Sequence, residues 1–256
     1  MGSPQRGTLY LVPAPLDFGC ATQAPLTDVM PDGTLLAASR IKHWICENAK
    51  SARALLKRVD AIQSLAAPLQ QQEITELPRS VHKKGDHAPA SYDARPLLQA
   101  ALHGEDVGLL SEAGMPAVAD PGSSVVRAAH DLGLEVVPLV GPVSLLLALA
   151  ASGLNGQNFA FVGYLPQEAA ARLQRLRELE QLALRTGQTQ LFNETPYRNP
   201  AMWQALLQAL NPGTRVTVAS ALTLPTARCR TASVAAWKLQ PVPVAPDLPA
   251  VFALGA

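Results

Sequence analysis

LSEAGMPAVADPG, residues 110–122, is the stretch of sequence that determines the expected fold. It follows the short apolar segment Val107–Leu110, which predicts a β-strand, and it leads into a segment with helical periodicity. Gly114 permits a close approach of the backbone to a ligand, and Asp120 followed by Pro121 is typical of a helix N-cap with proline at the first helical position. The loop is therefore either part of a ligand site or simply a well-capped turn.

The same arrangement recurs after the next expected strand, at residues 134–139. Its loop is Val140-Gly141-Pro142-Val143-Ser144, and an apolar helix is expected from residue 143 to residue 152. Backbone amides at a helix start suit a carboxylate or another polar ligand group, although helix initiation alone also explains a glycine and a proline there. Two such loops after neighbouring strands predict a shared crevice.

Around these loops the sequence alternates between expected strands and helices. Such alternation implies right-handed crossovers and a parallel sheet covered on both faces, with ligands bound in the loops at the carboxyl ends of its strands. Residues 67–93 are polar and irregular, and we expect an exposed loop there. The other expected elements of this half are strands at residues 8–12 and 34–38 and helices at residues 41–59, 92–103 and 123–132.

A second series of elements begins at residue 159. We place the domain boundary near residue 155, which gives an N-terminal domain of residues 1–155 and a C-terminal domain of residues 156–256. The expected elements are strands at residues 159–164, 190–192, 215–220 and 250–254 and helices at residues 167–184 and 200–210.

Composition narrows the class of protein. Of the 256 residues 48% are hydrophobic and only 5% aromatic, which is typical of an aliphatic interior between helices and sheets. The formal net charge of +1 predicts no global field towards nucleic acid or an anionic membrane. Three cysteines without a CxxC pair favour neither a disulfide framework nor a zinc site, so we expect a cytoplasmic protein without a metal.

Targeting and nucleotide motifs are absent from the sequence. The first residues lack the apolar stretch of a signal peptide, and Pro138, Gly141 and Pro142 interrupt the most apolar segment, so we expect no membrane span. The loop after the first strand has no G-x-G-x-x-G, and the chain contains no P-loop, HExxH or GxSxG motif. These absences disfavour nicotinamide enzymes, nucleotide hydrolases, zinc proteases and α/β-hydrolases.

Two acidic segments are candidates for catalysis. FNETPYR, residues 192–198, combines a carboxylate, a phenol and a guanidinium within seven residues. Glu194 has two interpretations. It acts in function, as a general base or as a substrate contact, or it belongs to a structural cluster of caps and salt bridges. ENAK, residues 47–50, presents the same choice for Glu47, with helix-surface charge as the alternative.

These loops resemble those of the tetrapyrrole methylase superfamily, class III of the S-adenosylmethionine-dependent methyltransferases. Within it, the resemblance is to the branch that 2′-O-methylates a cytidine of bacterial small-subunit ribosomal RNA. Two departures concern the second loop, where Glu112 and Met115 replace the aspartate and threonine that the family usually has. The matching segments, in order, are GTLYLVPAP (7–15), SEAGMPAVADPG (111–122), VPLVGP (137–142), ASGL (151–154), FVGYLP (161–166) and ETPYR (194–198).

The resemblance implies an α/β fold of two αβα domains, the first with a mostly parallel sheet and the second with a mixed sheet. It also implies S-adenosylmethionine in a cleft between the domains, and a homodimer. Its cofactor contacts, transferred to this sequence, are Pro13, Ser111, Glu112, Ala113, Gly114, Met115, Pro116, Gly141, Pro142 and Ser144.

The methyl acceptor stays open among three hypotheses. An RNA 2′-O-methyltransferase would use Glu194 or Glu47 as the base, with phosphate contacts from basic side chains. A methyltransferase for a tetrapyrrole-like metabolite is favoured by the near-neutral charge, and a non-enzymatic binding protein would keep only the cofactor loops. The basic candidates are Arg79, Lys83, Lys84, Arg172, Arg175 and Arg177.

Overall fold

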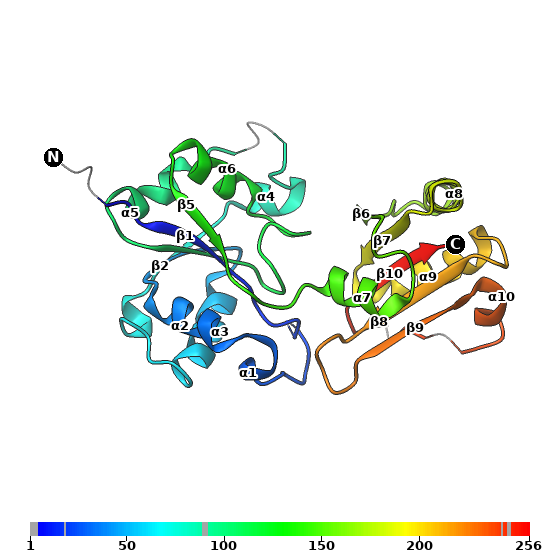
Figure 1. Ribbon diagram of the computed structural model, residues 1–256, viewed down its shortest axis with the longest axis horizontal. Coiled ribbons are helices and arrows are strands. Elements are labelled where there is room, and N and C mark those ends of the chain that lie inside the picture. Colours follow the sequence, from blue (N-terminus) through cyan, green and yellow to red (C-terminus); the bar gives the residue numbers. More distant parts are fainter. Residues whose placement is uncertain (1–4, 18, 89–91, 242, 245–246) are drawn as a thin grey trace. The chain divides into compact units, whose positions relative to one another are not determined.

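The computed structural model describes residues 5–17, 19–88, 92–241, 243–244 and 247–256 (Figure 1). The chain divides into two units: Met1–Gly19 with Gln23–Pro142, and Cys20–Thr22 with Val143–Ala256. The sequence predicts a boundary near residue 155, whereas this division falls between Pro142 and Val143. Helix α7 (Ser144–Ser152) belongs to the second unit because its apolar side chains pack on the sheet of that unit. The side chains of residues 82–84 are not described.

The sheet of the first unit has five strands that all run parallel. Parallel strands place their carboxyl ends at one edge of the sheet, so the loops that follow them are neighbours. The parallel sheet that was predicted for the N-terminal domain is therefore confirmed. The strands, in their order across the sheet, are β3 (Glu73–Glu76), β2 (His43–Cys46), β4 (Val107–Leu110), β1 (Thr8–Val12) and β5 (Glu135–Pro138).

Helices cover both faces of this sheet (Figure 1). Alternate residues of β1 face opposite sides, so Val12 packs with the helices of one face and Leu9 with those of the other. One face holds α1 (Leu26–Val29), α2 (Asp32–Arg40) and α3 (Ala49–Asp60), with the short η1 (Leu69–Gln71). The other holds α4 (Arg79–Lys84), η2 (Arg95–Leu98), α5 (Gln99–Leu102) and α6 (Ser123–Asp131).

The sheet of the second unit is mixed, as expected. Its first two strands are parallel to each other, and all its other pairs are antiparallel. The strands, in their order across the sheet, are β6 (Phe159–Tyr164), β7 (Thr189–Glu194), β10 (Ala250–Gly255), β8 (Arg215–Ser220) and β9 (Arg228–Ser233).

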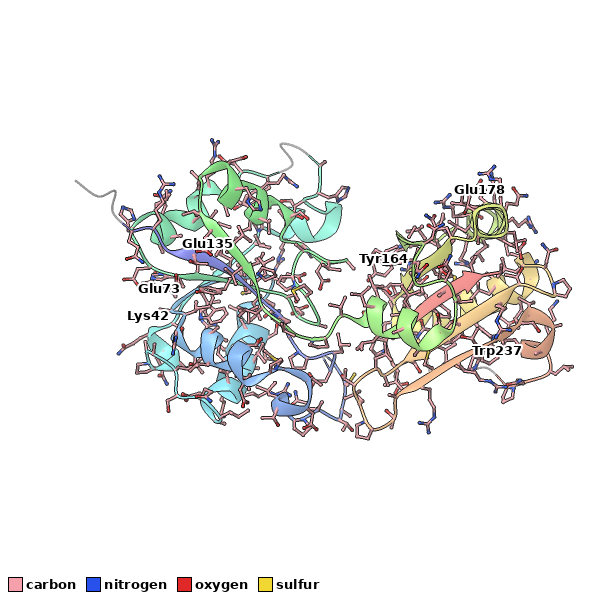
Figure 2. All side chains as sticks on the ribbon, viewed as in Figure 1. Lys42, Glu73, Glu135, Tyr164, Glu178 and Trp237 are labelled. Carbon is pink, nitrogen blue, oxygen red and sulfur yellow. The ribbon has the colours of Figure 1, made fainter. Side chains whose placement is uncertain are left out.

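Helix α7 packs on one face of this mixed sheet, and three further helices pack on the other. The larger core includes Trp203 and Trp237, whose rings meet edge to face with centroids 5.0 Å apart (Trp237 is labelled in Figure 2). The helices of this face are α8 (Ala169–Thr186), α9 (Asn199–Ala209) and α10 (Val234–Trp237), and η3 (Pro196–Arg198) precedes α9.

Three sequence predictions in the first unit are wrong. Residues 34–38 were expected as a strand but lie within α2, which starts directly after Pro31. Residues 41–59 were expected as helical, but their first part forms the buried strand β2, because four residues are too few to show a strand period. Residues 67–93 were expected as a loop but include β3 and α4.

None of the helices in the described parts of the chain is both long enough and apolar enough to cross a bilayer.

Candidate functional site

Three loops of the first unit meet at the carboxyl edge of its parallel sheet. Ala14, after β1, and Gly114, after β4, form an antiparallel bridge in which each backbone N–H donates to the other carbonyl at 2.9 Å. Gly141, after β5, lies directly against the ring of Pro13. The two glycine-and-proline turns predicted from the sequence are therefore brought together, with the first loop between them.

The two glycines are required by this contact. A Cβ on Gly141 would lie 2.3 Å from Cγ of Pro13, which is closer than real Cβ contacts allow. Gly114 has φ +77°, and a Cβ there would lie 3.3 Å from Cδ2 of Leu16 and 3.5 Å from the carbonyl oxygen of Pro142. Packing against Pro13 therefore requires glycine at position 141, and the positive φ favours glycine at position 114.

The first loop is held rigidly. Residues 12–17 are all buried, and Arg58 of α3 forms an ion pair with Asp17 at 3.1 Å. Both members of this ion pair also bind the backbone of Ala24: its N–H donates to Asp17, and its carbonyl accepts from Arg58. Pro13 therefore occupies a fixed position at the edge of the sheet.

The second loop is closed by its own side chain and has a strained backbone. The Ser111 hydroxyl donates to the carbonyl of Gly114 at 2.8 Å. Ala117 and Ala119 have φ of 63° and 64°, in the left-handed region that costs a residue with a Cβ about 1 kcal/mol or more. Of the other candidate residues in this loop, Pro116 is buried and Ala113 and Met115 are half-buried.

The expected N-cap at Asp120 is wrong. Helix α6 begins at Ser123, and its N-cap is Gly122 with φ +133°, a conformation that favours glycine over aspartate. The capping carboxylate comes instead from Asp86, which accepts hydrogen bonds from the backbone of Gly122 and from the backbone and hydroxyl of Ser124. Asp86 lies 36 residues before Gly122, so a local sequence pattern cannot indicate that it caps this helix.

Asp120 instead belongs to a group of carboxylates beside the loops. Burial, and then the charges of Glu47 and Glu112, raise the pKa of Asp120 to about 7. Glu112 is held by the Ser51 hydroxyl, which donates to it at 2.6 Å. Glu47 and Glu112 are candidates from the sequence, whereas Asp120 was expected only as an N-cap, since its environment depends in part on Glu47, which is far away in the chain.

The third loop is anchored from α2. The Thr34 hydroxyl donates to the carbonyl of Val140 at 2.7 Å, and Pro142 is buried. Ser144, the last of the expected cofactor contacts, is the first residue of α7 and belongs to the second unit. Within the described ranges, no three His, Cys, Asp or Glu side chains are grouped so as to hold a metal ion.

Glu194, the other candidate base, lies in the second unit at the end of β7. It is buried and forms an ion pair with Arg198 at 2.8 Å, and it also accepts a hydrogen bond from the backbone N–H of Thr195 at 2.7 Å. This is the geometry of a capping and salt-bridge cluster. A base at this position would have to act from within an ion pair.

Comparison with a family of known proteins gives a match over most of the chain. The model of the tetrapyrrole (corrin/porphyrin) methylases matches residues 49–236. Two bacterial relatives are both called ribosomal RNA small subunit methyltransferase I. The one from Mesorhizobium japonicum is 32% identical over 222 residues, which cover 86% of this chain and 65% of the relative. The one from Pseudomonas aeruginosa is 44% identical over 95 residues, or 37% of this chain and 32% of the relative.

The matched regions thus span less than two thirds of the length of these relatives. Two solved structures are similar over nearly the whole chain. The methyltransferase CobJ matches with a TM-score of 0.55 at 18% identity, covering 97% of this chain and 94% of that one. The uroporphyrin-III-C-methyltransferase from Thermus thermophilus matches with a TM-score of 0.51 at 17% identity, covering 98% and 94%. At such identities these two structures establish the fold alone.

Proposed function

The chain belongs to the tetrapyrrole (corrin/porphyrin) methylase family, and from this membership we propose that it is an S-adenosylmethionine-dependent methyltransferase. The observation that supports the proposal best is the meeting of three glycine- and proline-containing loops at the carboxyl edge of a parallel sheet. That edge is where open α/β sheets bind nucleoside ligands.

The residues at this edge fit the chemistry of the cofactor. S-adenosylmethionine combines hydroxyl donors, an ammonium group and a sulfonium cation, and it supplies an activated methyl group when bound. The carboxylates of Glu47, Glu112 and Asp120 complement positive charge and donor hydroxyls. We assign binding to Pro13, to the loop from Ser111 to Pro116, and to Gly141, Pro142 and Ser144.

For the acceptor we propose the ribose 2′-hydroxyl of a cytidine in small-subunit ribosomal RNA. The names of the relatives support RNA as the acceptor, and the resemblance of the loops supports the atom. The task of the protein is to align the hydroxyl oxygen with the methyl group and to exclude water. Glu47 is the first candidate for the base, because it lies near the carboxylates beside the cofactor loops, and Glu194 is the second.

A small molecule such as a tetrapyrrole-like metabolite is the second candidate acceptor. The formal net charge of +1 favours it, because a large nucleic-acid footprint normally needs an excess of basic residues. With an RNA acceptor, the proposal also places the protein in the cytoplasm and, as the family resemblance implies, in a homodimer.

Transfer of labelled methyl groups tests the proposal. The protein is incubated with tritiated S-adenosylmethionine and small ribosomal subunits from cells that lack this modification, and the RNA is digested to nucleosides. We expect label in 2′-O-methylcytidine, and a loss of about 100-fold in rate for Glu47→Gln with unchanged cofactor affinity. The exposed substitution Leu184→Ala, on α8, serves as the control.

Other results would contradict parts of the proposal. Label found only in a small molecule from cell extract would replace RNA with the second candidate acceptor. Cofactor binding without any labelled product would indicate a binding protein rather than an enzyme. An unchanged rate in Glu47→Gln would remove Glu47 as the base.

A further inference from the structure

Glu112, at the start of the second loop, receives a hydrogen bond from a helix that is distant in the sequence. The Ser51 hydroxyl, on α3, donates to Oε1 of Glu112 at 2.6 Å. The two residues are neighbours because β2, which precedes α3, pairs with β4, which precedes the second loop. No other donor to Glu112 occurs among the residues that the structure describes. The orientation of this carboxylate therefore depends on Ser51.

Ser51 is held in place without the use of its hydroxyl. It lies in the first turn of α3, where the side chain of Asn48 caps the helix and accepts a hydrogen bond from the backbone N–H of Ser51. Glu76, which ends β3, accepts another from the N–H of Ala49 at 2.6 Å. The hydroxyl has a single proton, and the charged Glu112 oxygen at 2.6 Å is a better acceptor than the Asn48 carbonyl at 3.3 Å. Ser51 is thus a fixed donor to the second loop.

The surroundings of Glu112 make such a donor necessary. Burial, and then the charges of Glu47 and Glu112, raise the pKa of Asp120 to about 7, so the three carboxyl groups lie near one another. Like charges repel, and a carboxylate in such a group turns away from its neighbours unless a donor holds it. The left-handed backbone of Ala117 and Ala119 in the same loop also persists only where the surroundings fix it. The contact from α3 fixes the start of this loop.

Glu112 keeps an oxygen for a ligand. Its side chain is half-buried, and within the described part of the chain its Oε2 accepts no hydrogen bond. A carboxylate that is held through one oxygen presents the other to a cationic or hydroxyl donor at a defined place. S-adenosylmethionine has such donors in its ammonium group and its hydroxyls.

We propose that Ser51 is a positioning residue for the cofactor: it holds Oε1 of Glu112 so that Oε2 accepts a hydrogen bond from a donor group of S-adenosylmethionine. Ser51 acts only through Glu112 and does not contact the cofactor. The inference rests on the proposed function, because it takes the three loops as the cofactor site. It adds a residue outside these loops on which their affinity depends, whichever molecule accepts the methyl group.

Equilibrium dialysis with tritiated S-adenosylmethionine tests this role on the full chain. We expect Ser51→Ala to lower the affinity about tenfold, because a hydrogen bond to a charged group is lost. Ser51→Thr should bind like the wild type, since threonine keeps the hydroxyl, whereas Ser51→Val has the shape of threonine without the hydroxyl and should bind like Ser51→Ala. Ser64→Ala, at an exposed serine just after α3, is the matched control and should change nothing.

A double-mutant cycle shows whether Ser51 acts through Glu112. We expect Ser51→Ala to have no further effect in a protein that already carries Glu112→Ala, because the positioned group is gone. If Ser51 only supported the fold of α3, its removal would lower the affinity by the same factor in both backgrounds. That result would overturn the inference.

Equal affinities of Ser51→Thr and Ser51→Val, or an unchanged affinity in Ser51→Ala, would also overturn the inference. In either case the proposed function stands if the wild type still binds the cofactor and transfers its methyl group. If the folded wild type does not bind S-adenosylmethionine, the proposed function and this inference are both wrong. Circular dichroism of each variant separates the loss of one contact from the loss of the fold.

Discussion

At the scale of single residues, Asp120 has the most unusual environment beside the cofactor loops. Burial, followed by the charges of Glu47 and Glu112, raises its pKa from 3.8 to about 7. In the unfolded chain the carboxyl group ionises near pH 4, so between about pH 4 and 7 the folded protein holds a proton that the unfolded chain has lost. The contribution of Asp120 to the free energy of unfolding therefore falls as the pH rises through this interval.

The substitution Asp120→Asn removes this cost and keeps the shape of the side chain. The full shift corresponds to about 4 kcal/mol. Because Asp120 is only half-buried and solvent screens its charge, we expect the variant to be more stable than the wild type by about 2 kcal/mol at pH 8 and equally stable near pH 4. Urea unfolding at a series of pH values measures the difference. Equal stability of the two proteins at every pH would show that the carboxyl group is not destabilised by its neighbours.

The sequence predicts the glycine and proline residues of the candidate site better than the environments of its charged side chains. Gly114 and Gly141 follow from local patterns, because glycine and proline constrain the backbone wherever the rest of the chain lies, and Pro13 is implied by the family resemblance. The pKa of Asp120 depends on Glu47, which is close only in the folded chain. For Glu194 the sequence left two interpretations open, and the structure shows its ion pair with Arg198.

At the scale of elements, α6 depends on a carboxylate from outside its own sequence. Burial opposes ionisation of Asp86, but hydrogen bonds from Ser124 and Gly122 outweigh it and hold the pKa of Asp86 below its usual value. We expect Asp86→Ala to lower the free energy of unfolding by about 1–2 kcal/mol, since the start of α6 loses its cap. Thermal unfolding followed by circular dichroism measures this loss.

Asp93→Ala is the matched control for that substitution. Asp93 is exposed, and its ion pair is with Arg95, two residues away, so its removal should cost little. Equal stability losses in both variants would contradict a special role for Asp86 at the start of α6.

The elements that the sequence predicts well have apolar signals of their own. β6 and β8 were predicted with the bounds that the structure has. The edge strands β3 and β9 were missed, because exposed strands such as Glu73–Glu76 and Arg228–Ser233 show little apolar alternation. Their pairing depends on neighbouring strands, which a local pattern does not contain.

At the scale of the whole molecule, the chain combines an acidic unit and a basic unit. The formal charges are −3 for the first unit and +4 for the second. We propose that the positive unit attracts a polyanionic acceptor such as RNA. This proposal predicts that salt weakens RNA binding far more than cofactor binding.

Calorimetric titration with S-adenosylmethionine tests the central claim most directly, because every proposed step depends on the cofactor loops. We expect binding at one site per chain, a loss of at least about tenfold in affinity for Gly141→Ala, whose Cβ would clash with Pro13, and unchanged affinity for Gly213→Ala, where a Cβ meets open space. Absence of binding to the folded wild-type protein, or equal affinities of Gly141→Ala and the wild type, would contradict the account.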